Sequence, residues 1–126
     1  MNKQDRVELF IKKAKNDYKT ACVLDSDNED FTDSIVFHCQ QSIEKYLKAY
    51  LVKNDLSFPK THDIDHLLSI AVQKDSEFEL FQEISLLFSE YAVEIRYENV
   101  FIERSDVSEA LKQTQLFIDF IGKRLA

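Results

Sequence analysis

The sequence contains one glycine, Gly122, and one proline, Pro59, among 126 residues. Tight β-hairpin turns need residues with positive φ, and glycine supplies most of them. A fold of many short strands joined by tight turns is therefore disfavoured, and the chain is expected to form long helices. Its length is that of one compact domain, residues 1–126, which can bury a core without disulfides or a structural metal.

The chain is acidic, with 16 Lys and Arg residues against 23 Asp and Glu residues and a net charge of −7. This charge repels phosphate backbones, so a contact with nucleic acid would need a local basic patch. Cys22 and Cys39 are too few for a disulfide framework or a Cys-rich zinc site, and both are expected in apolar helix stripes. No run approaches the roughly eighteen apolar residues of a membrane span, and the first residues lack the apolar core of a signal peptide. We therefore expect a cytoplasmic protein that contacts no membrane.

Apolar residues recur at spacings of three and four along the chain, as in amphipathic helices. They predict helices over about 5–24, 31–53, 64–71, 76–95 and 106–125. Short polar links between them indicate an all-α fold, an antiparallel (up-and-down) four-helix bundle with an additional short helix. The buried stripe expected on the fourth of these helices is Leu80, Phe81, Ile84, Leu87, Phe88, Tyr91 and Ile95.

Capping patterns predict where these helices begin and end. A polar side chain with an acidic residue three positions later is typical of a helix start. The expected starts are Asp30 with Asp33, Thr61 or Asp63, Ser76 with Glu79, and Asp106 with Glu109. Asn54 is expected to supply the left-handed residue that ends the second helix.

Four polar residues of the second helix lie at helical spacing and form one face: Gln41, Glu44, Lys45 and Lys48. Glu44 and Lys48 are an i, i+4 pair in the favourable order. The simplest interpretation is a solvated, salt-bridged face that contributes a few tenths of a kcal/mol. The alternative is that this face binds a ligand or a partner.

His62 and His66 are four residues apart at the start of the third helix, with acidic residues beside them. Histidines at this spacing can share a metal ion, and a carboxylate can add an oxygen ligand. However, a metal site needs further ligands, and the one other histidine is His38. We therefore expect no metal, with His62 in a capping or hydrogen-bonding role and His66 exposed.

Arg96 and Tyr97 stand at the end of the fourth helix. Arg96 can interact with the last helix carbonyls, and Tyr97 can pack against the bundle. The planar fork of an arginine also suits a phosphate group, because it binds two oxygens at once. The chain has no glycine-rich phosphate loop, no Ser-His or Cys-His nucleophile spacing and no aromatic RNA-binding sheet motif.

Taken in order, three segments resemble the HEPN domain family: Gln41–Ala49 on a long helix, Lys60–Ile64 at the next helix start, and Arg96–Glu98. The resemblance covers nearly the whole chain. It implies a bundle of four main helices with a short extra one, usually a homodimer, and no cofactor. It also implies a minimal nucleotidyltransferase as partner in a toxin–antitoxin-like pair, and a nucleotide or RNA as ligand. The family's recurring polar positions correspond to Gln41, Glu44, Lys45, Lys48, His62, Arg96 and Tyr97.

The chain departs from the ribonuclease branch of this family, which carries an Arg followed four to six residues later by a His. Here the residues at that distance from Arg96 are Val100, Phe101 and Ile102, none of which can move a proton. RNA cleavage needs a group that takes the proton of the 2′-hydroxyl and one that stabilises the phosphorane. We therefore expect a nucleotide-associated or partner-binding module. A diverged metal-independent ribonuclease using His62 and a purely structural interaction domain are the alternatives.

Fifteen aromatic residues are many for a chain of this length. Phe58, Phe78, Phe101 and Phe120 lie off the regular apolar stripes. They are expected either to form an exposed patch that a second copy covers or to close the ends of the bundle.

Overall fold

The computed structural model describes residues 1–26, 30–96 and 102–126, and within them all side chains except those of residues 92–96. Across these ranges the chain forms helices and no strand, which confirms the all-α prediction. The elements are α1 (Lys3–Ser26), α2 (Thr32–Lys53), α3 (Ile64–Lys74), the short 3-10 helix η1 (Ser76–Phe81), α4 (Gln82–Arg96) and α5 (Arg104–Leu125).

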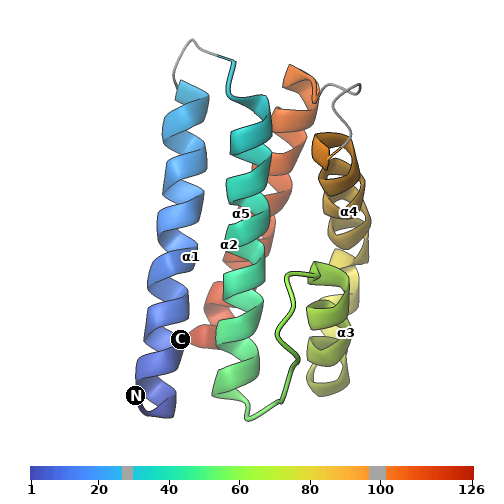
Figure 1. The fold of residues 1–126 in the computed structure, drawn as a ribbon. Helices are drawn as coiled ribbons and strands as arrows, with labels where there is room; N and C mark the ends of the chain where they lie inside the picture. Colours follow the sequence, from blue (N-terminus) through green and yellow to red (C-terminus); the bar gives the residue numbers. More distant parts are fainter. Residues whose placement is uncertain (27–29, 97–101) are drawn as a thin grey trace.

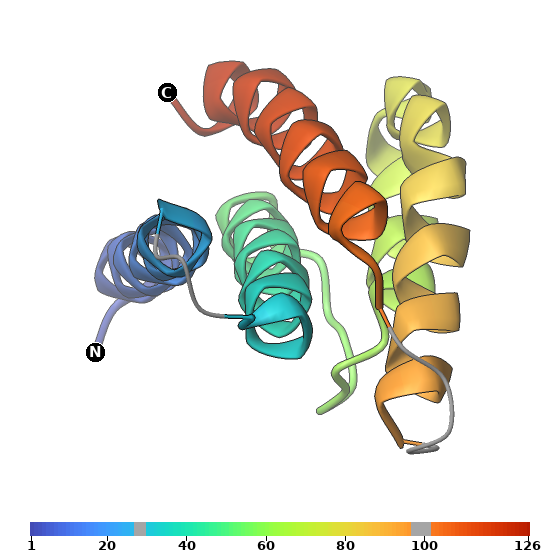
Figure 2. The same cartoon turned by 90° about the horizontal axis from the view of Figure 1, so that it is seen from above.

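α2 lies in the middle of the bundle and contacts α1, α3, α4 and α5. α1 and α2 run antiparallel, as do α4 and α5, and the short α3 is added beside α4 (Figure 1). Seen along the bundle, α1 and the α3–α4 pair lie on opposite sides of α2, with α5 on a third side (Figure 2). The predicted four-helix bundle with an additional short helix is therefore confirmed.

The central position of α2 follows from its composition, because its apolar residues cover more than one face. Its fully or nearly fully buried apolar residues are Ile35, Val36, Cys39, Ile43, Tyr46, Leu47, Ala49, Tyr50, Leu51 and Val52. α1 buries a narrower stripe centred on Val7, Ala14 and Ala21, and its other side faces solvent. A helix with one buried stripe belongs at the edge of a bundle, which is where α1 lies (Figure 2).

α2 ends at Lys53, as predicted, but the left-handed residue that follows it is Asp55 and not Asn54. Asn54 is not left-handed, with a φ of −98°, whereas Asp55 has a φ of 57°. The amide of Leu56 donates to the carbonyl of Leu51 (2.9 Å), and the amide of Asp55 donates to that of Val52 (3.1 Å). This pair of bonds is a Schellman motif, which requires the left-handed residue directly after the C-cap. Asp55 therefore takes the place that glycine usually fills.

The predicted helix starts are right at α3 and wrong at α2. Asp63 caps α3 by accepting a hydrogen bond from the amide of Asp65 (3.0 Å). α2 instead begins after Phe31, whose side chain makes no capping hydrogen bond. Asp33, which was expected to complete the cap, lies in the first turn, where its charge complements the helix dipole.

The starts predicted at Ser76 and Asp106 are displaced. Asp75 caps η1 by accepting from the amide of Glu77 (3.0 Å), and α4 begins only at Gln82. The N-cap of α5 is Glu103, three residues before Asp106, and its amide donates to the Asp106 carboxylate (2.9 Å). Asp106 therefore closes the first turn from inside the helix, the role that Glu or Gln has in a capping box.

The burial predicted around residue 80 is also wrong. Leu80 was placed in the core but is 74% exposed, whereas Phe78 is 0% exposed. The reason is that residues 76–81 form a 3-10 helix with three residues per turn, which shifts the apolar stripe relative to an α-helix. Burial of Leu87 is partial, and Ile95 lies outside the described side chains.

An aromatic cluster joins α2, η1 and α5. The ring of Phe78 lies 4.7 Å from that of Tyr50 and 5.0 Å from that of Phe120, measured between centroids. Arg124 stacks on Phe120 at 3.6 Å and donates to Asp75 (2.7 Å), so its guanidinium lowers the pKa of that carboxyl group. Phe78 and Phe120 therefore close this end of the bundle. Phe58 is half-buried, and Phe101 lies outside the described residues.

Replacing Phe78 with alanine should reduce the free energy of unfolding by about 3–5 kcal/mol, because a fully buried ring leaves a cavity. Leu80→Ala is the matched control, and its effect should stay within about 0.5 kcal/mol because the side chain is exposed. Urea denaturation measures both changes. Equal losses of stability for the two variants would contradict the burial of Phe78 and the exposure of Leu80 in η1.

Candidate functional site

The polar face predicted on α2 is built around a buried carboxylate. The side chain of Glu44 is 2% exposed. This burial is unexpected, because the face of α2 that carries Glu44 and Lys45 was interpreted as solvated. A charged side chain without water is costly unless it is paired and hydrogen-bonded. The interpretation of this face as a solvated salt bridge therefore does not describe Glu44.

Three side chains satisfy the Glu44 carboxylate. Lys48 Nζ donates to Oε1 (2.9 Å), and His62 Nδ1 lies 2.7 Å from the same oxygen. Gln41 Nε2 donates to the other oxygen, Oε2, at 3.3 Å. Four of the seven residues predicted from the sequence are thus brought together by one carboxylate.

His62 reaches Glu44 from the irregular segment 54–63, which runs beside α2 (Figure 1). Pro59 prevents this segment from continuing as a helix, and the Asp63 cap fixes where α3 begins. A carboxylate accepts hydrogen bonds, so Nδ1 carries the proton and the lone pair of a neutral ring lies on Nε2. The His62 side chain is 82% exposed, which leaves this face of the ring open to solvent.

Lys45 belongs to a second cluster on the α1 side of α2. Its Nζ contacts Asp17 Oδ2 at short range, and His38 Nδ1 lies 3.0 Å from Asp17 Oδ1. The side chain of Asp17 is 13% exposed. Sequence reasoning missed Asp17 and His38. The available signal was the spacing of His38, Gln41 and Lys45, which places them along one line of α2.

These pairings limit the positive charge that the face offers. Lys45 is neutralised by Asp17, and Lys48 is neutralised by Glu44. The two lysines and two carboxylates cancel, so the excess charge depends on whether His38 and His62 are protonated. Both lysines are therefore held by carboxylates.

Arg96 and Tyr97 are not joined to these clusters by any described contact. Arg96 is the last residue of α4, its side chain is outside the described ones, and Tyr97 lies outside the described residues. α4 ends toward the end of the bundle where α5 begins, whereas Glu44 lies near the middle of α2 (Figure 1). The placement of these two residues in the site stays a prediction.

Two further features of the described residues are the side chains that could bind a metal ion and the two thiols. No three His, Cys, Asp or Glu side chains gather as metal ligands in the part of the chain that the structure describes. His62 bonds Glu44, and His66 is exposed, as expected. Cys39 is buried as predicted, but Cys22 is exposed, so its placement in an apolar stripe was wrong.

Comparison with known protein families supports the resemblance. The family model described as HEPN domain matches residues 7–125. The chain belongs to the HEPN family. Comparisons with curated proteins and with solved structures give no match. Among the described helices of this HEPN protein, none combines the length and apolar character that crossing a bilayer requires.

Breaking the central pair of this HEPN domain should be costly. Glu44→Leu leaves the Lys48 ammonium, which is 12% exposed, without its carboxylate, and should lower the free energy of unfolding by about 3–5 kcal/mol. The double variant Glu44→Leu/Lys48→Met removes both charges and should recover much of this loss. Urea denaturation of the two single variants and the double variant measures the coupling. Strictly additive losses would contradict a buried, coupled pair.

The two thiols should differ sharply in reactivity. Burial raises the pKa of the Cys39 thiol to about 12, whereas Cys22 is exposed. Iodoacetamide reacts with thiolates, so at pH 8 it should label Cys22 and spare Cys39 until the protein unfolds. Because the Cys39 proton is held more tightly when folded, its burial should also destabilise the fold as the pH rises from about 9 toward 12. Mass spectrometry of peptides checks the labelling; rapid labelling of folded Cys39 would contradict its burial.

Proposed function

We propose that this HEPN protein is a cytoplasmic module that binds a nucleotide or a protein partner through the polar face of α2 and His62. Its partner would be a minimal nucleotidyltransferase, in a toxin–antitoxin-like pair. The observation that carries the proposal is Glu44, a buried carboxylate that pairs with Lys48 and holds the exposed His62 at the surface of the bundle.

The energetics of this cluster support a binding role over a purely structural one. Replacing a buried ion pair with apolar residues of similar size is often neutral or stabilising. A domain that needed only stability would gain little from keeping Glu44 and Lys48 inside. Positioning a largely exposed imidazole, as Glu44 does with His62, serves a binding surface better than a core.

The proposal includes a homodimer. Phe78 and Phe120 contribute nothing to an exposed patch, because they pack at the end of the bundle. The large apolar side chains that stay exposed on the described helices include Phe37, Leu86 and Leu116. Apolar surface of this kind favours self-association. Light scattering at micromolar concentration tests it, and a strictly monomeric protein would remove the dimer from the proposal.

A diverged ribonuclease is the second candidate, and one observation favours it. His62 Nδ1 is held 2.7 Å from Glu44, which orients the ring and leaves Nε2 to accept a proton from a 2′-hydroxyl. Expression without a partner separates the two functions. Growth arrest with degraded RNA, abolished by His62→Gln, favours the enzyme, whereas harmless accumulation favours the binding module.

Arg96→Ala should weaken binding of ATP, or of the proposed nucleotidyltransferase partner, by about tenfold, because a charged hydrogen bond to phosphate or carboxylate is lost. The free energy of unfolding should not change. Lys112→Ala, which removes an exposed positive charge from α5, is the matched control. Calorimetric titration measures both ligands, and unchanged affinity for each would remove Arg96 from the site.

A further inference from the structure

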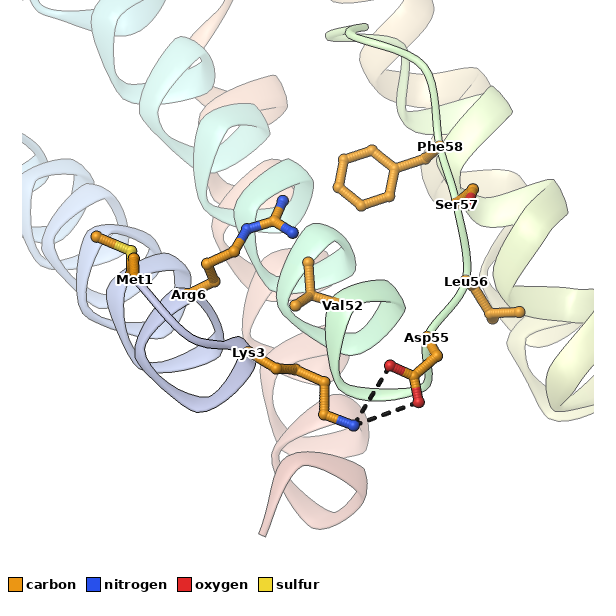
Figure 3. Close-up of a pocket in the computed structure, with 8 residues that line it drawn as sticks. All are labelled: Met1, Lys3, Arg6, Val52, Asp55, Leu56, Ser57 and Phe58. Carbon is orange, nitrogen blue, oxygen red and sulfur yellow. Dashed lines mark hydrogen bonds and ion pairs between the residues drawn. The ribbon is translucent and has the colours of Figure 1, made fainter.

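A hollow of about 540 Å³ lies where α1 begins and α2 ends, away from the Glu44 cluster. Its walls come from three segments: the first residues of α1, the last turn of α2 and the start of the segment 54–63 (Figure 3). The volume lies within the range of small-molecule sites, about 300–1,000 Å³. The hollow is therefore large enough for a ligand of that class.

Arg6 is the charged side chain of this hollow that is available to bind a ligand. Its guanidinium points into the space above Val52 (Figure 3), and no described carboxylate pairs with it. Lys3, one turn earlier, is instead paired with Asp55 at 3.3 Å. The chain as a whole has a net charge of −7 and repels anions. An arginine without a carboxylate partner in a concave surface creates a local positive potential that attracts an anion.

Phe58 faces Arg6 from the opposite wall (Figure 3). The ring is half-buried and packs against the small core cluster of Val7, Ala49 and Val52. A ring fixed in this way offers a flat apolar surface on which another ring can stack. The hollow thus combines an anion-binding fork, an aromatic wall and an apolar floor.

The backbone that carries Phe58 is held in place. Leu56 and Asp55 donate to the last carbonyls of α2, and Asp55 adopts a left-handed conformation to do so. The Lys3–Asp55 pair ties the same segment to α1. A preformed wall reduces the conformational entropy that the protein loses when a ligand binds.

We propose that this hollow binds a phosphate monoester attached to a flat ring. The Arg6 guanidinium would hold two phosphate oxygens, and the ring would stack on Phe58 above Val52. The charged side chains of the lining are Lys3, Arg6 and Asp55, which leaves one positive charge in excess. The site is separate from the face that contains Lys48 and His62, so it goes beyond the function proposed above.

The test is an NMR titration of the labelled protein with phenyl phosphate and with inorganic phosphate. Phenyl phosphate should shift the amide signals of Arg6 and of residues 55–58. Arg6→Gln should weaken its binding at least tenfold, because a charge-assisted bidentate contact is lost. Arg6→Lys should recover only part of the affinity, because an ammonium lacks the fork. Lys19→Gln is the matched control: it removes an exposed positive charge more than three turns along α1 and should change nothing.

The aromatic wall is tested separately. Phe58→Leu should lower the affinity for phenyl phosphate to that for inorganic phosphate and leave the latter unchanged. Equal binding of the two probes by the unmodified protein would overturn the stacking contact. Unchanged affinity in Arg6→Gln, or no shifts at residues 55–58, would overturn the site. The charge-balanced double variant Glu44→Leu/Lys48→Met should not affect phenyl phosphate binding. A result that overturns this site is therefore distinguishable from one that overturns the polar face on α2.

Discussion

The burial of Glu44 in the central helix is the constraint around which the surrounding polar residues are arranged. α2 contacts α1, α3, α4 and α5, so a charge on its inner side has little access to water. The carboxylate must therefore be paired, and Lys48 and His62 are held on one oxygen to do this. The same pairing links the irregular segment 54–63 to the helix. Fold and candidate site thus depend on a single ionised group.

The shortage of glycine has a consequence for function as well as for fold. Phosphate is often bound by backbone amides of glycine-rich loops, which the chain lacks. An anion must then be held by side chains that project from helices or from the anchored segment 54–63. Asp55 illustrates the same constraint, since a left-handed position that glycine usually occupies is filled by an aspartate whose carboxylate also pairs with Lys3.

Much of the fold was predictable because it depends on local periodicity, and most of the site was not because it depends on distant pairs. Apolar spacing placed α2, and capping residues limited the start of α3 to Thr61 or Asp63, of which Asp63 is the cap. Apolar spacing misplaced Leu80, because a 3-10 turn has no apolar signature that separates it from an α-helix. The Asp17–Lys45 contact spans 28 positions between two helices, and no spacing rule within one helix reveals it. Likewise, spacing could not tell that Glu44 is buried.

The segment 54–63 connects the two surfaces to which we assign ligands. Its start provides Phe58 to the hollow beside Arg6, and its end provides His62 to Glu44. The segment is fixed at both ends, by the Schellman motif with the Lys3–Asp55 pair and by the Asp63 cap. A ligand that repositions Phe58 therefore acts on a backbone only four residues from His62. Coupling between the surfaces requires that the segment have two arrangements with different affinities, because a ligand shifts an equilibrium only by its differential binding.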